Sequence, residues 1–91
     1  MSSGRVLVVE DEVLIRMLAV DMLLDLGRDA DEAGTAAEAI ELLRAPGAEY
    51  ALVLLDLGLP DKRGDDLVRD IRQSHAGLPL VVASGEDQTD V

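Results

Sequence analysis

The 91-residue chain contains no cysteine, no tryptophan and no phenylalanine, and Tyr50 is its only aromatic residue. The absence of cysteine excludes disulfides, thiolate metal ligands and thiol catalysis. Basic residues are also scarce, because 8 Lys and Arg stand against 19 Asp and Glu, for a formal charge of −11. This charge argues against duplex DNA or an anionic membrane as a direct partner. It favours cations or a partner with a basic patch.

The chain also lacks a long hydrophobic run. No apolar run approaches the length of about 18 residues that a transmembrane helix needs, and Met1–Arg5 has no apolar signal core. We therefore expect a soluble cytoplasmic protein. The length fits one domain, and 48% of the residues are apolar, enough to build a core.

Three short apolar runs predict strands: Val6–Val9, Ala51–Leu55 and Leu80–Ala83. Each run is continuous rather than alternating, as in parallel strands that are covered on both faces. Arg28–Ala33 has only alanines as apolar residues, and we interpret it as a weak edge strand. Helical segments separate these runs, so the order of elements predicts a parallel open α/β sheet with about four strands and three helices.

Three helices are expected between the strands. The first runs from about Glu12 to Leu26 and ends at Gly27. The second opens at Thr35–Glu38 with a capping-box pattern. The third follows Gly64, with acidic residues in its first turn and basic residues later, and its core face is predicted to be Leu67, Val68 and Ile71.

The first helix carries two apolar stripes instead of one. A surface helix needs only one stripe, so two imply two burial partners, the sheet and either another helix or another chain. We also expect the methionines of these stripes, Met17 and Met22, to lie in the core. The first stripe is Val13, Met17, Val20 and Leu24, and the second is Leu14, Ile15, Leu18, Met22 and Leu26.

Polar residues directly follow three of the predicted strands, where ligands bind in open parallel sheets. These are Glu10 and Asp11, then Asp56, then Ser84. Each alone has a plain structural explanation, a helix cap for the acidic pair and a turn for Asp56 or Ser84. Together, three clustered carboxylates repel one another unless a cation neutralises them. Oxygen ligands without His or Cys suit Mg²⁺, and an ionised Asp56 beside it can attack a phosphoryl group.

With these residues placed, the sequence resembles the receiver domain of two-component response regulators. The resemblance rests on Val6–Asp11, on Leu54–Pro60 with Gly64, and on Val82–Gly85. It implies a flavodoxin-like, three-layer fold with strand order 2-1-3-4-5. It also implies that Asp56 accepts a phosphoryl group from a histidine kinase or a histidine phosphotransfer protein.

The resemblance further implies how the site is divided. Glu10, Asp11 and Asp56 would hold Mg²⁺ together with the backbone carbonyl of Gly58. Ser84 would contact the phosphoryl group and shift on activation. The loop after the phosphoacceptor would be shaped by Pro60 and Gly64.

Residues 1–91 depart from the family pattern, which continues with a fourth helix, a fifth strand bearing a lysine and an aromatic residue, and a fifth helix. The only lysine is Lys62, in the loop after Asp56. We expect a fragment of a longer receiver, or a receiver completed by another subunit. The exposed Leu80–Ala83 strand edge, or the second apolar stripe of the first helix, would then favour a homo-oligomer. Lys62 and Arg63 are expected in a solvated loop, and His75 on the surface away from the acidic edge.

Other functions remain open at this stage. One is a protein-interaction or dimerisation module that has lost phosphorylation, motivated by the missing lysine and aromatic residue. Another is an aspartyl phosphohydrolase, which is disfavoured because such enzymes usually carry a second acid two residues after the nucleophile, where Gly58 stands. A dinucleotide site is disfavoured because Val6–Val9 leads into acids instead of a glycine-rich loop.

Overall fold

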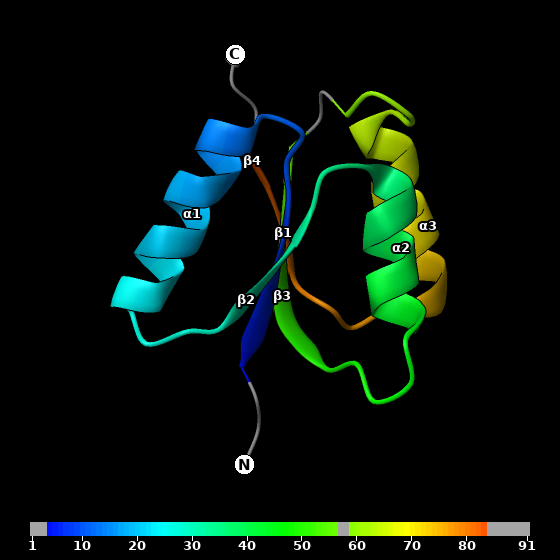
Figure 1. Cartoon of the computed structure of the whole chain (residues 1–91). Coiled ribbons are helices and arrows are strands. Elements are labelled where there is room, and N and C mark those ends of the chain that lie inside the picture. Colours follow the sequence, from blue (N-terminus) through cyan, green and yellow to red (C-terminus); the bar gives the residue numbers. More distant parts are fainter. Residues whose placement is uncertain (1–3, 57–58, 84–91) are drawn as a thin grey trace, which may run out of the picture.

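The computed structural model of the chain describes residues 4–56 and 59–83. Strands and helices alternate along it in the order β1 (Arg5–Val9), α1 (Val13–Asp25), β2 (Ala30–Ala33), α2 (Ala36–Arg44), β3 (Tyr50–Asp56), α3 (Gly64–Ser74) and β4 (Leu80–Ala83). The four strands form one parallel sheet in the order β2-β1-β3-β4. Helix α1 covers one face, and α2 and α3 cover the other (Figure 1). The predicted three-layer, open parallel α/β fold is confirmed.

The main core lies between the sheet and the α2–α3 layer. Alternate residues of the central strands point into it, so that Leu7 and Val53 are fully buried. Leu67 and Ile71 of α3 close the core from the other side, and Val68 packs partly against it. The predicted core face of the third helix is therefore confirmed.

The β2 edge strand is held mainly by polar contacts, as its shortage of apolar residues requires. Asp31 accepts two hydrogen bonds from the Arg5 guanidinium, at 3.1 and 3.0 Å, and a third from the Tyr50 hydroxyl at 2.6 Å. On the other face of the strand, Glu32 pairs with Arg16 of α1 at 3.1 Å. These ion pairs replace the apolar packing that a central strand would have.

The ends of the first two helices largely follow the sequence signals. Gly27 follows α1 with a φ of 81°, a conformation that glycine adopts without strain. Thr35 caps α2 by accepting a hydrogen bond from the Glu38 amide at 3.1 Å. Glu38 Oε1 in turn accepts a hydrogen bond from the Gly34 amide at 2.7 Å, one residue earlier than the amide used in a standard capping box.

Helix α1 differs from the prediction that one of its apolar stripes packs on the sheet. The half-buried positions of α1 are Arg16, Ala19, Val20 and Leu23, so the sheet-facing side lies beside the first stripe instead of along it. The physical reason is Arg16, whose hydrogen bonds to the β1–α1 loop and to β2 fix the rotation of the helix. The expectation that Met17 and Met22 are core residues is wrong, since they are 52% and 66% exposed.

Apart from the half-buried Val20, both apolar stripes of α1 are consequently exposed in the described structure. Large side chains that are at least half exposed on this helix and its C-cap are Val13, Leu14, Ile15, Met17, Leu18, Met22, Leu24 and Leu26. Among the described residues, no helix combines the length and the apolar character needed to cross a membrane.

Candidate metal centre

The carboxyl ends of the two central strands bring three carboxylates together. Val9 of β1 lies in register with Leu55 of β3, so the residues that follow them in sequence come out at the same edge of the sheet. Glu10, Asp11 and Asp56 each place a carboxylate oxygen within 4.8 Å of the others. The predicted convergence of the three acids is confirmed. Ser84 and Gly58, the other two predicted contributors, lie outside the described residues.

The spacing of these oxygens suits one small divalent cation. Mg²⁺ binds oxygen at about 2.0–2.1 Å in an octahedron, so opposite ligands stand about 4 Å apart. An upper separation of 4.8 Å needs only small side-chain adjustments to reach that geometry. The donors are all carboxylates, which suit a hard ion such as Mg²⁺ better than they suit softer metals. The residues present therefore fit the ion.

Repulsion between the carboxylates of the cluster explains why a bound cation would stabilise it. The pKa of Glu10 is raised, mainly because its carboxyl is partly buried and secondarily because Asp56 and Asp11 repel its charge. A backbone amide works in the other direction, since Glu10 Oε2 accepts a hydrogen bond from the Glu12 amide at 3.0 Å. Glu12 is the N-cap residue of α1 and the helix has no side-chain cap hydrogen bond, so the helix-cap explanation considered for Glu10 and Asp11 is wrong.

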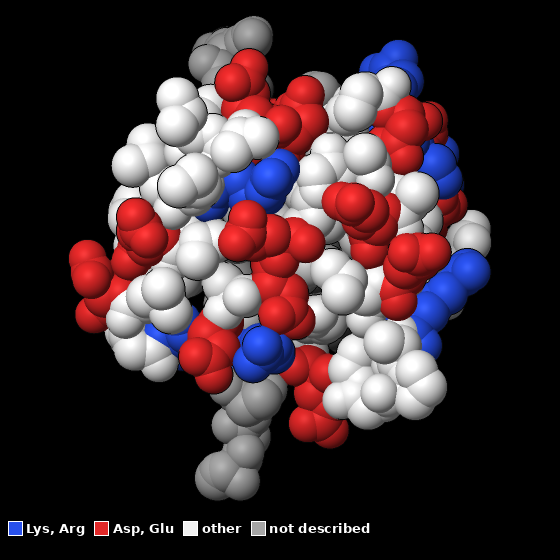
Figure 2. All heavy atoms as spheres, in the orientation of Figure 1, with Lys and Arg blue, Asp and Glu red and all other residues white. Residues whose placement is uncertain are grey.

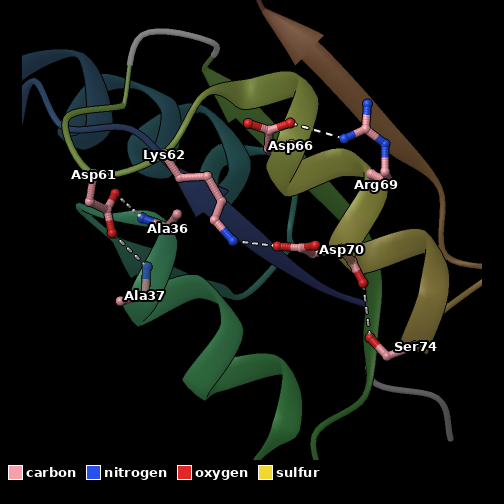
Figure 3. Close-up of polar contacts among 8 residues, drawn as sticks. All are labelled: Ala36, Ala37, Asp61, Lys62, Asp66, Arg69, Asp70 and Ser74. Atoms are coloured by element: carbon pink, nitrogen blue, oxygen red, sulfur yellow. Dashed lines mark hydrogen bonds and ion pairs between the residues drawn. The ribbon is translucent and has the colours of Figure 1, made fainter.

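The loop after Asp56 is anchored at three points by its described residues. Leu59 is buried in the core at 8% exposure. Asp61 accepts hydrogen bonds from the amides of Ala36 and Ala37, at 2.8 and 3.0 Å, at the start of α2. Lys62 forms an ion pair with Asp70 of α3 (Figure 3). The loop therefore joins the end of β3 to both helices of one layer.

The predicted loop residues are distributed around this anchored segment. Pro60 is exposed within the loop, and Gly64 is buried at the first residue of α3. Arg63 pairs with Asp65 at 3.6 Å and stays on the surface, as expected. Lys62 lies in the loop, as expected, with its side chain 35% exposed because it pairs with Asp70. Within the described residues, no ion pair joins Lys62 to Asp56.

Two residues near the site were not singled out by the sequence interpretation. Arg16 donates a 2.7 Å hydrogen bond to the backbone carbonyl of Glu10. Its signal was visible in part, because a basic residue separates the two apolar stripes of α1. Asp61 gave no usable signal, since its partners in α2 lie 24 and 25 residues earlier in the chain.

The opposite end of the sheet has a different character. A cavity of about 560 Å³ opens there, lined by residues that include Tyr50, Pro79 and His75. His75 lines this cavity, which agrees with the prediction that the histidine is remote from the acidic edge, and its Nδ1 lies 2.8 Å from Ser74 Oγ.

Acidic side chains outnumber basic ones over the face shown in Figure 2, and they lie over both helical layers.

Comparison with known proteins identifies the class to which this fold and this acidic edge belong. The family model of the response regulator receiver domain matches residues 6–91. The chain therefore belongs to the receiver-domain family of two-component response regulators.

Curated relatives with receiver-like sequence include a transcriptional regulator and a sensor kinase. It is 39% identical over 83 residues to the transcriptional regulatory protein PhoP of Escherichia coli, covering 91% of this chain and 36% of PhoP. It is 35% identical over 83 residues to the sensor kinase CckA of Brucella abortus, covering 91% of this chain and 9% of CckA. The chain thus spans only a minor part of these curated relatives.

Solved structures give the same result at the level of the fold. A receiver protein from Pseudomonas putida matches with a TM-score of 0.85 and 34% identity, over 99% of this chain and 73% of that one. The response regulator TrrA from Thermotoga maritima matches with a TM-score of 0.86 and 28% identity, over 92% of this chain and 71% of that one. The TrrA structure was determined in complex with Mg²⁺ and beryllium fluoride.

Proposed function

We propose that this domain is a phosphoryl acceptor in which Asp56 is the phosphorylated residue and Mg²⁺ is the cofactor. The observation that carries the proposal is the meeting of Glu10, Asp11 and Asp56 within 4.8 Å at the carboxyl ends of the central strands. The TrrA complex supports the choice of metal, because it places Mg²⁺ in a receiver of the same fold. Gly58, through its backbone carbonyl, and Ser84 are proposed as the remaining contacts to metal and phosphoryl group.

The donor in this proposal is a phosphohistidine of a histidine kinase or a histidine phosphotransfer protein. One carboxylate oxygen of Asp56 attacks the phosphorus, an O–P bond forms, and the N–P bond to the donor imidazole breaks. The electron pair of that bond leaves with the imidazole, which takes a proton, and Asp56 becomes an acyl phosphate. A bound divalent cation supplies charge neutralisation for the phosphoryl oxygens.

Residues of the chain itself orient the Asp56 carboxylate for the reaction. Asp56 is partly buried at the end of β3, so its backbone is fixed by the sheet while its carboxyl reaches the surface. The loop that follows is pinned by Asp61 to α2 and by Lys62 to α3. The strand before Asp56 and the described loop residues from Leu59 onward are held in place, which limits the entropy that is lost when the phosphoryl group is placed.

The output of such a domain is a changed surface and not a released product. We therefore classify it as a signalling domain that takes part in its own phosphorylation and dephosphorylation, and not as an enzyme with an external substrate. The partner is a protein, in keeping with the family and with a charge of −11. A partner with a basic patch suits this charge.

The test is labelling of the chain by a small phosphodonor such as acetyl phosphate, read by intact mass with and without Mg²⁺. We expect one phosphoryl group on the wild-type chain in Mg²⁺ and none after chelation of the metal. Asp56→Asn should abolish labelling. Asp25→Asn, an exposed acid at the end of α1, is the matched control and should label like the wild type.

Failure of the wild-type chain to label in Mg²⁺ would contradict the proposal. It would favour the alternative, an interaction or dimerisation module without phosphorylation. Labelling that persists in Asp56→Asn would also contradict it, because the acceptor would then be another residue.

We also propose that these 91 residues self-associate. Strand β4 is an edge of the described sheet, and Val81 and Val82 on it are 47% and 43% exposed. The open stripes of α1 add a second apolar surface. Exposed edges and contiguous apolar patches both promote association between chains.

A further inference from the structure

Arg16 connects the proposed metal centre to the rest of the fold. Its side chain leaves α1 on the side that faces the sheet and is only 18% exposed. One guanidinium nitrogen, Nη1, donates to the backbone carbonyl of Glu10 at 2.7 Å. Another, Nε, donates to the Glu32 carboxylate of β2 at 3.1 Å. One side chain thus ties the β1–α1 loop to both α1 and β2.

Glu10 is held at both ends as a result. Its backbone carbonyl accepts from Arg16, while its carboxylate Oε2 accepts from the Glu12 amide at 3.0 Å. With the carbonyl and one carboxylate oxygen fixed, little freedom remains in how Glu10 faces Asp11 and Asp56. The two contacts set the direction in which the acidic pair leaves the sheet.

The space around Arg16 is also tight. A Cβ placed on Gly34, after β2, would lie 3.1 Å from Arg16 Nη1 and 3.9 Å from its Cζ. The guanidinium therefore lies against Gly34 as well as against the Glu10 carbonyl. A planar, forked donor group fits such a position better than the single ammonium of lysine.

Arg16 could affect metal binding in two opposite directions, and Coulomb's law alone predicts that it weakens binding. A positive charge beside the site repels Mg²⁺, so its removal should strengthen binding. A residue that holds the ligands in place has the reverse effect, because partners of metal ligands typically contribute about 10–100-fold to metal affinity. The sign of the change on removing Arg16 therefore separates the two roles.

We propose that Arg16 is a positioning residue for the Mg²⁺ centre, which it organises by anchoring the Glu10 carbonyl. This inference rests on the proposed function, since it requires that Glu10, Asp11 and Asp56 bind the ion. Arg16 acts through Glu10 and makes no contact with the metal in this proposal.

The experiment is calorimetric titration of the 91-residue chain with Mg²⁺ alone. Arg16→Ala should weaken binding about tenfold or more, in spite of the lost positive charge. Arg16→Lys keeps the charge but lacks the fork, so its affinity should lie between those of the wild type and Arg16→Ala. Arg28→Ala is the matched control, because Arg28 also donates to a backbone carbonyl, that of Gly4 at 3.2 Å, at the other end of β1.

The outcomes are distinguishable. If the wild type binds Mg²⁺ and Arg16→Ala binds as tightly or more tightly, the positioning role is overturned while the proposed function stands. If Arg16→Ala does not fold, as judged by circular dichroism, Arg16→Lys decides, and an affinity equal to that of the wild type would overturn the role. If the wild type does not bind Mg²⁺ at all, the proposed function fails and this inference fails with it. An equal loss in Arg28→Ala would also overturn it.

Discussion

At the scale of single residues, Glu10 shows how a site for a cation lowers the stability of the metal-free protein. Its raised pKa, caused first by burial and then by Asp56 and Asp11, means that its charge is less favourable in the folded than in the unfolded chain. Glu10→Gln removes the charge and keeps an oxygen that can accept from the Glu12 amide. We expect it to stabilise the metal-free chain, by less than about 1 kcal/mol because solvent screens a partly exposed group.

The gain from Glu10→Gln has a defined pH dependence. A carboxyl with a raised folded pKa destabilises the fold above that pKa and is neutral below its ordinary pKa. The difference between variant and wild type should therefore be present at neutral pH and disappear in acid. Urea denaturation without Mg²⁺ at several pH values measures it. Equal stabilities at neutral pH, or a gain that grows in acid, would contradict the account.

Tyr50 offers a second test at this scale, because it is the only aromatic residue in the sequence and its ultraviolet titration is unambiguous. Burial, followed by the hydrogen bond to Asp31, raises its pKa from 10.0 to about 12. We expect the folded chain to titrate near 12, and Asp31→Asn to lower that value. The stabilisation linked to Tyr50 is complete below pH 10 and is lost as the pH rises toward 12. Titration near 10 in the folded wild type would contradict the structure.

At the scale of secondary-structure elements, the junction between the β3–α3 loop and α2 depends on Asp61. Its carboxylate satisfies two amides at the start of the helix (Figure 3), and these bonds lower its pKa. We expect Asp61→Ala to lower Tm by a few degrees, as loss of a helix cap does. Asp61→Asn, which keeps one acceptor oxygen, should lose less.

The contribution of Asp61 should also fade in acid. A depressed carboxyl pKa gives stabilisation that is present above the ordinary pKa and lost as the pH falls through the folded value. Thermal unfolding of the three chains at neutral and acid pH tests this. An Asp61→Ala chain as stable as the wild type at neutral pH would show that the two hydrogen bonds contribute nothing net.

Most of the elements follow from local sequence. The apolar runs of β1, β3 and β4 and the cap at Thr35 are signals of a few residues, and each marks its element. The position of Asp56 at the end of β3 follows from the same local pattern, which is why the acidic cluster was predictable. The rotation of α1 was not, because Arg16 fixes it through partners in the β1–α1 loop and in β2. Such contacts are set by the fold and not by periodicity.

At the scale of the whole molecule, the exposed apolar side of α1 has the largest consequence. Two helices cover one face of the sheet and α1 covers the other (Figure 1). Leu14 and Leu18 of α1 are 73% and 62% exposed. We expect the chain to self-associate at micromolar concentration in sedimentation velocity. Leu14→Glu with Leu18→Glu should shift it toward monomer without unfolding it, since neither side chain is buried. A wild-type chain that sediments as a monomer would contradict the expectation.

The most direct test of the central claim is to locate the phosphoryl group chemically. An acyl phosphate at Asp56 is reduced by borohydride to homoserine, which peptide mass mapping detects at that position. The account predicts homoserine at residue 56 alone, only after treatment with phosphodonor and only in Mg²⁺. Reduction at Glu10 or Asp11, reduction without Mg²⁺, or no reduced residue at all would contradict it.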